Sequence, residues 1–143
     1  MTRGGSGHRL VDHTGDMALS VWAPTLPALY DEAARALFAV IVDLERIEAR
    51  EELPLSIAGA VDREDLLVRF LAELLFHHDA HGWLFRGFRV RAIDAHAVAG
   101  DALGERMDPA RHAIERQIKA VTYHTTDLRE DPDGWHARIV LDL

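Results

Sequence analysis

Two long stretches of this chain repeat apolar residues with the spacing of an α-helix, and they alternate with segments of a different period. The first runs from Thr25 to about Val42 and carries Leu29, Ala33, Ala36, Leu37, Val40 and Ile41. The second follows Asp62, ends near His78-Asp79, and carries Leu66, Leu67, Phe70, Leu71, Leu74 and Leu75. Thr25 and Asp62 are residue types that cap helix N-termini. The pattern therefore predicts two amphipathic helices, each with a buried apolar face.

The remaining segments predict β-strands, because their apolar residues recur roughly every second position. We expect strands at 17–22, 51–61, 83–92, 95–107, 117–128 and 135–143. Pro54 favours an edge strand, Gly100-Asp101 predicts a tight turn, and Asp131-Pro132-Asp133-Gly134 predicts the turn of a final hairpin. This order is not a repeated β–α–β alternation. We therefore expect an α+β fold, a single domain with two amphipathic helices packed on a mainly antiparallel or mixed β-sheet.

Composition excludes several classes of site. With 48% hydrophobic and 28% charged residues, the chain has the balance of a soluble globular domain. It has no cysteine, which excludes disulfides, thiolate metal sites and a cysteine nucleophile. Residues 1–8 are mostly small and polar, so we expect a flexible N-terminal start followed by a single domain at 9–143. No apolar run approaches the roughly 18 residues of a membrane span, and a cytoplasmic location is expected.

The formal net charge of −8 bears on the partners of the chain. A protein that binds nucleic acid needs a basic footprint for the phosphate backbone. The arginines here are scattered among acidic residues along the sequence. We therefore expect no direct nucleic-acid binding and no membrane contact, and any role in RNA or DNA metabolism would run through a protein partner.

Two acidic segments stand at opposite ends of the chain. Asp16 follows Gly15 in a short loop before a strand, and Asp142 lies off the apolar face of the last strand. Taken alone, the pattern favours an Asx-turn residue at Asp16 and a solvated charge at Asp142. If the fold brings them together, their carboxylates and the terminal oxygens of Leu143 would suit a hard cation such as Ca²⁺ or Mg²⁺.

Other polar residues give weaker indications. The nine histidines include no H-E-x-x-H pair, so a catalytic zinc site is not expected. His13 could support the Asp16 loop by a hydrogen bond, whereas His112 and His124 are typical of surface or structural histidines. Glu105 is expected on a solvated strand face. We find no nucleophile elbow, phosphate loop or dinucleotide fingerprint, and assign no catalytic residue.

Several motifs, taken in order, resemble the archease family. The segment Asp12-His13-Thr14-Gly15-Asp16 is similar to the family's opening Asp-His-Thr-Ala-Asp, and Asp142-Leu143 is similar to its Asp-Ile ending. The family order continues between them with residues 29–43, 65–75, Gly104-Glu105, Arg111-His112 and Lys119-Ala120-Val121-Thr122-Tyr123-His124. Each motif is short, but their order and spacing together are specific, and they span the chain from Val11 onward.

The resemblance implies an accessory protein, not an enzyme, that activates an RtcB-type RNA ligase in tRNA splicing or RNA repair. It would promote guanylylation of the ligase and multiple turnover. The resemblance also implies a divalent-cation site on Asp16, Asp142 and Leu143, expected to hold Ca²⁺, with Mg²⁺ or Mn²⁺ as alternatives. The roles of Lys119 and Asp12 stay open. Two other interpretations also remain: a stand-alone metal-dependent hydrolase, and a chaperone-like interaction module for RNA-modifying enzymes.

Overall fold

The computed structural model describes residues 5–143, apart from the side chain of His13. Within that range the elements are β1 (Gly7–His13), β2 (Asp16–Ala23), α1 (Leu26–Ile41), η1 (Leu44–Arg46), β3 (Glu51–Ile57), α2 (Arg63–His81), β4 (Trp83–Ile93), β5 (Val98–Arg106), β6 (Ala120–Asp131) and β7 (Gly134–Asp142). Residues 1–4 of the expected flexible start, and the hydrogen bond expected of the His13 side chain, lie outside the described residues. Gly7 and His8 already belong to β1, a strand that the sequence pattern did not predict.

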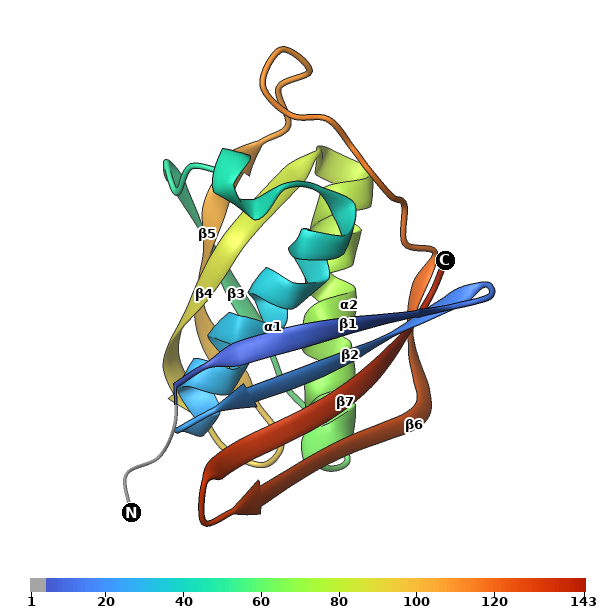
Figure 1. Cartoon of the computed structure of the whole chain (residues 1–143). Helices are drawn as coiled ribbons and strands as arrows, with labels where there is room; N and C mark the ends of the chain where they lie inside the picture. The colour runs from blue at the N-terminus through green and yellow to red at the C-terminus, as the bar shows by residue number, and fades with distance from the viewer. Residues whose placement is uncertain (1–4) are drawn as a thin grey trace.

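All strand pairings are antiparallel, and the strands form two sheets. One sheet has the order β1-β2-β7-β6, and the other has the order β3-β5-β4. Both helices lie between the sheets: α1 contacts β4 on one side and β1 and β2 on the other, and α2 contacts β6 and β4 (Figure 1). The predicted α+β class is confirmed. The division into two sheets explains why α1 is buried around most of its circumference.

The predicted boundaries of α1 are confirmed, and local chemistry accounts for them. Thr25 is the N-cap, and its hydroxyl accepts a hydrogen bond from the Ala28 amide at 3.2 Å. Pro27 lies in the first turn, where its missing N–H costs nothing. The buried face includes one charged residue, Glu32, whose carboxylate lies 2.5 Å from Nδ1 of His8 in β1. That pair ties the first strand to the helix.

Replacing Thr25 with alanine is expected to lower the free energy of unfolding by about 1 kcal/mol, because the Ala28 amide loses its acceptor. Chemical denaturation at pH 7 would measure the change. The control is Ser56→Ala on the exposed face of the edge strand β3, which should stay within about 0.5 kcal/mol of the parent. Equal effects of the two substitutions would contradict a capping role for Thr25.

The segment after α2 differs from its predicted form. Gly82 caps α2 in the left-handed region at φ 73°, so the helix runs to His81, slightly past the predicted end. The tight turn predicted at Gly100-Asp101 is wrong, since both residues lie inside β5. A Cβ at Gly100 would stand 2.2 Å from the Arg89 carbonyl oxygen, so this glycine permits close strand packing. The chain reverses instead just before β5, where the Asp94 carboxylate accepts two backbone amides.

Two other turn and edge predictions are confirmed. Pro54 lies in β3, an edge strand of its sheet. Residues 131–134 form the turn between β6 and β7. The pairing of these strands is interrupted between Thr122 and Asp127, and Thr125 in that bulge has a positive φ of 51°. Neither helix within residues 5–143 is long and apolar enough to cross a membrane.

Candidate cation site at the chain termini

The pairing of β2 with β7 brings Asp16 and Asp142 directly opposite each other, although they stand near opposite ends of the sequence. Directly opposed residues on antiparallel strands project to the same face of the sheet. Their neighbours Met17 and Leu141 point the other way, into the core, at 5% and 0% exposure. The two carboxylates therefore share the outer face of the sheet, at the end where the β1–β2 hairpin projects (Figure 1).

Backbone hydrogen bonds hold the strand ends that carry this pair. The Leu143 amide donates to the Gly15 carbonyl oxygen at 3.1 Å, and the Lys119 amide donates to the Asp142 carbonyl oxygen at 2.8 Å. Gly15 has φ 80°, which suits the two-residue turn between β1 and β2. The structure thus places Leu143 against the loop that leads into Asp16. We call this end of the molecule, formed by residues 12–16, Lys119, Asp142 and Leu143, the acidic tip.

The charges around the tip are partly paired. Arg116 Nη1 lies 2.9 Å from Asp12 Oδ2, and Lys119, the only lysine of the chain, is exposed. Among the described side chains, which exclude that of His13, none forms a hydrogen bond or ion pair with the carboxylate of Asp16 or Asp142. Like charges directly opposed across strands destabilise a sheet. This part of the fold therefore carries an unfavourable charge pair that a bound cation would relieve.

The donor chemistry of the tip fits a hard cation. Its oxygen donors are the two carboxylates and the main-chain oxygens of Leu143, with water available to fill the shell, as Ca²⁺ and Mg²⁺ require. Within the described part of the chain, no three His, Asp or Glu side chains gather in a way that could hold a metal ion. A cation here would thus depend on two carboxylates plus backbone oxygens.

A second polar cluster is buried at the far end of the molecule. Glu105 in β5 is 3% exposed, and its carboxylate receives the Glu48 amide at 2.7 Å and the guanidinium of Arg111. His112, also 3% exposed, accepts the Asp108 amide at Nδ1 and places Nε2 3.1 Å from Glu105. The expected solvated position of Glu105 is therefore wrong, whereas His112 is a structural histidine, as expected. The sequence pattern missed the burial because the covering segment has no regular structure.

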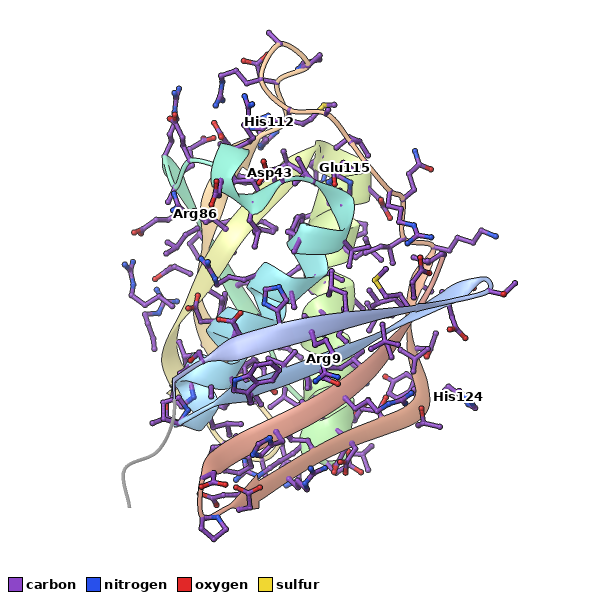
Figure 2. The ribbon with its side chains drawn as sticks, in the orientation of Figure 1. Arg9, Asp43, Arg86, His112, Glu115 and His124 are labelled. Carbon is purple, nitrogen blue, oxygen red and sulfur yellow. The ribbon has the colours of Figure 1, made fainter. Side chains whose placement is uncertain are left out.

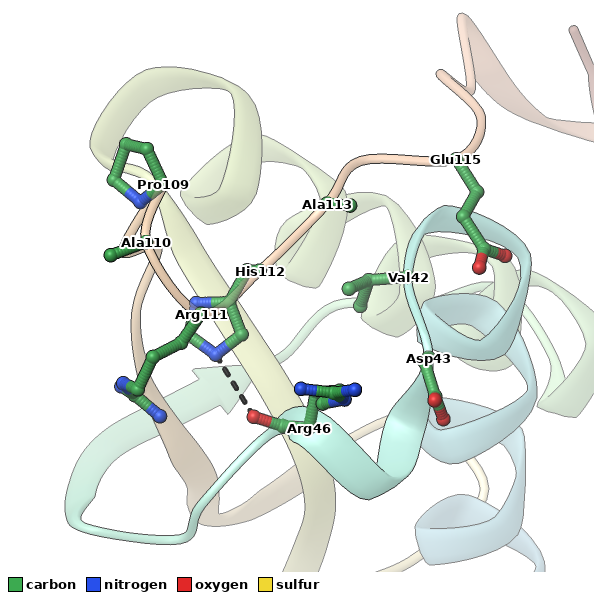
Figure 3. Close-up of a pocket in the computed structure, with 9 residues that line it drawn as sticks. All are labelled: Val42, Asp43, Arg46, Pro109, Ala110, Arg111, His112, Ala113 and Glu115. Carbon is green, nitrogen blue, oxygen red and sulfur yellow. Dashed lines mark hydrogen bonds between the residues drawn. The ribbon is translucent and has the colours of Figure 1, made fainter.

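The pKa of Glu105 shows that this buried carboxyl group is ionised at neutral pH. Burial alone would raise the pKa of Glu105, but Arg111, the Glu48 amide and His112 outweigh it and hold that pKa at about 2. The cluster ties the segment after β5 to η1 and borders an open pocket of about 310 Å³. In Figure 3, His112 is bonded to the Arg46 carbonyl oxygen, while Asp43 and Glu115 line the opposite side. We assign the cluster a structural role.

The segment between this cluster and the acidic tip connects the two ends of the molecule. The amides of Glu115 and Arg116 both point to the Ile41 carbonyl oxygen at the end of α1, at 2.7 and 3.4 Å. Ile118 is buried, at 5% exposure. Further along the segment, Arg116 forms an ion pair with Asp12, and the Lys119 amide donates a hydrogen bond to the Asp142 carbonyl oxygen. The family-like motif at Lys119 is therefore placed at the tip by backbone contacts.

Fold and tip together define a class of protein: a small α+β domain whose helices lie between two antiparallel sheets and whose first hairpin and last strand present paired aspartates. The model of the Archease protein family matches residues 8–143. The chain is 40% identical to the protein archease of Methanopyrus kandleri over 136 residues, covering 93% of this chain and 96% of that protein. It is 37% identical to the protein archease of Pyrococcus furiosus, covering 92% and 95%. The chain belongs to the archease family.

A solved structure agrees with this assignment. The fold is similar to the solution structure of Methanobacterium thermoautotrophicum protein 1598, with a TM-score of 0.80 and 33% sequence identity. The match covers 96% of this chain and 99% of that protein. The antiparallel sheets and the two helices between them are thus the architecture of a known relative.

Proposed function

We propose that this protein activates an RtcB-type RNA ligase, promoting its guanylylation and repeated turnover in tRNA splicing or RNA repair. Membership of the archease family supports the proposal, and the single observation that carries it to particular residues is the pairing of Asp16 with Asp142. In this role the protein is a cofactor of the ligase and performs no chemistry of its own. Its tip would hold a divalent cation, expected to be Ca²⁺, through Asp16, Asp142 and Leu143.

The charge and shape of the tip support one mechanism for such activation. A projecting hairpin with two directly opposed carboxylates can reach into a site that holds metal ions, whose positive charge attracts the carboxylates. A bound cation supplies positive charge that can be placed next to a phosphate oxygen. Asp16 and Asp142 orient that charge, and the Gly15–Leu143 hydrogen bond fixes the strand ends that carry them. The net charge of −8 also favours a basic partner.

Guanylylation of the ligase by GTP, measured with and without this protein, tests the proposal. The parent protein is expected to accelerate formation of the ligase–guanylate intermediate and to sustain multiple turnover. A variant carrying Asp16→Ala and Asp142→Ala should lose nearly all stimulation. The matched control carries Asp79→Ala and Asp133→Ala, which removes the same charge from exposed positions outside the tip, and should stimulate like the parent.

Three outcomes would overturn the proposal or part of it. Full stimulation by the Asp16→Ala/Asp142→Ala variant would exclude the cation role of the tip. Turnover of a small substrate by the protein alone would favour a metal-dependent hydrolase. Binding to the ligase that persists in chelator, together with unchanged guanylylation, would favour a chaperone-like module.

A further inference from the structure

Within residues 5–143, the four-stranded sheet has an outer face that neither α1 nor α2 covers. In β2 and β7 the residues Leu19, Val21 and Ile139 point inward and are at most 1% exposed. The alternating residues therefore project to the opposite side, away from α1 and α2. Figure 2 shows Arg9 on this outer face, in front of the sheet. The face begins at the acidic tip and continues to the other end of the strands.

One cross-strand row on this face carries groups that bind phosphate. Arg9 in β1 pairs with Ser20 in β2, and Ser20 pairs with Arg138 in β7. Neighbouring strands lie about 4.8 Å apart, so the three side chains span roughly 10 Å. Two guanidinium groups flanking a hydroxyl match the donors that recognise a phosphate. We call Arg9, Ser20 and Arg138 the phosphate row.

The next row on the same face is aromatic. Trp22 in β2 pairs with Gly7 on one side and His136 on the other. A Cβ at Gly7 would stand 2.6 Å from the indole, so the ring lies across this glycine. Trp22 is 37% exposed, the highest value among the three tryptophans. Residues of both rows, Ser20, Trp22, His136 and Arg138, line a cleft of about 270 Å³, together with Asp127 and Arg129 of β6.

Charge on the face contrasts with the charge of the whole molecule. The two rows and the facing part of β6 contribute Arg9, Arg129 and Arg138 against two aspartates, Asp127 and Asp131. Asp127 is held by Arg129 at 2.7 Å, and Asp131 lies 3.1 Å from His136. Arg138 bonds the Thr125 hydroxyl, and Arg9 has no ion pair within residues 5–143. The fold thus gathers arginines that are scattered in a sequence of net charge −8.

We propose that this outer face binds single-stranded nucleic acid, with a phosphate on the phosphate row and the adjoining base stacked on Trp22. Two residues along a strand span about 7 Å, a separation suited to the phosphate and base of one nucleotide. Exposed aromatic rings on antiparallel sheets stack bases, and guanidinium groups hold the backbone. The proposal departs from the expectation based on net charge alone, and it does not rest on the ligase proposal.

Fluorescence anisotropy with a labelled ten-nucleotide single-stranded RNA at 50 mM salt tests the proposal. The parent protein is expected to bind, and the Arg9→Ala/Arg138→Ala variant should bind at least tenfold more weakly. The slope of log affinity against log salt should flatten by about 1.4, because two phosphate contacts are lost. The control Arg50→Ala/Arg89→Ala removes two exposed arginines elsewhere and should match the parent.

The aromatic row has its own test. Trp22→Ala should weaken binding about tenfold, whereas Trp22→Phe should stay within about threefold, because stacking needs a ring and not an indole. In the parent, the indole N–H resonance of Trp22 should shift on titration with the RNA, which requires no variant. Absence of binding up to 1 mM protein, or equal losses in both arginine pairs, would overturn the proposal. Equal affinity for a nucleoside monophosphate would assign the cleft to free nucleotides and overturn the strand assignment.

Discussion

Replacing Glu105 with glutamine is expected to lower the free energy of unfolding by about 3 kcal/mol at pH 7. The Glu105 carboxylate accepts hydrogen bonds from the Glu48 amide and the Arg111 guanidinium and lies 3.1 Å from His112 Nε2. The NH₂ group of a glutamine side chain would point its own N–H donors at these donors. It would also leave the partly buried Arg111 without its counter-charge, and breaking such a pair typically costs about 3–5 kcal/mol. The control is Asp101→Asn on the same strand. Asp101 is also buried, at 6% exposure, but its partners Arg89 and Arg91 are more than half exposed, so we expect about 1 kcal/mol.

The stabilising contribution of Glu105 is expected to decrease as the pH falls. Because the pKa of Glu105 is lowered from 4.5 to about 2 in the folded protein, its contribution is fully present above pH 4.5 and is lost as the pH falls toward 2. Each pKa unit corresponds to 1.36 kcal/mol, so the part of this contribution that depends on pH is about 3 kcal/mol. Urea denaturation of parent and variant between pH 2 and pH 7 measures the difference. A difference that stays constant over this range would contradict the assigned role of the carboxylate.

Replacing Asp16 and Asp142 together with asparagine should have opposite effects with and without a cation. Without Ca²⁺ the variant should be more stable than the parent by up to about 1 kcal/mol, since the repulsion between directly opposed carboxylates is removed. With Ca²⁺ at 100 times its Kd, the parent should gain about 2.7 kcal/mol and the variant nothing. Thermal unfolding with Ca²⁺ or with chelator measures both effects.

A matched variant and single substitutions separate the site from general charge effects. Asp79→Asn with Asp133→Asn removes the same charge from exposed positions outside the tip and should keep the full Ca²⁺ gain. Each single replacement, Asp16→Asn or Asp142→Asn, should raise the Kd for Ca²⁺ at least tenfold, because affinity follows the charge count of the ligands. Calorimetric titration would show it. A parent protein that Ca²⁺, Mg²⁺ and Mn²⁺ all fail to stabilise would refute a cation site at the tip.

The sequence predicted most strongly what local chemistry determines. The α1 boundaries follow from Thr25 and the spacing of the apolar residues, and the last hairpin follows from the turn at 131–134. Glycine was harder to interpret: Gly15 and Gly82 lie in turns or caps, but Gly100 lies within a strand where two backbones approach. A single sequence does not distinguish these uses, because both require the absence of a Cβ.

Features that depend on contacts between residues far apart in the sequence could not be predicted from local sequence patterns. The meeting of Asp16 with Asp142 depends on the register of β2 against β7, and family resemblance, not periodicity, anticipated it. The burial of Glu105 depends on an irregular segment that folds over it. The gathering of Arg9 and Arg138 on one face needs three strands in register, and β1 itself was not predicted.

The pairing of β2 with β7 also determines when the acidic tip can form during folding. Because β7 follows every other described element in the sequence, Asp142 can meet Asp16 only after β7 itself has been synthesised and has paired with β2. A chain in which β7 has not been made, or has failed to pair with β2, does not offer two opposed carboxylates. A partner that recognises the paired aspartates would therefore engage only chains in which β2 and β7 have paired, and cation binding can be used to measure that pairing.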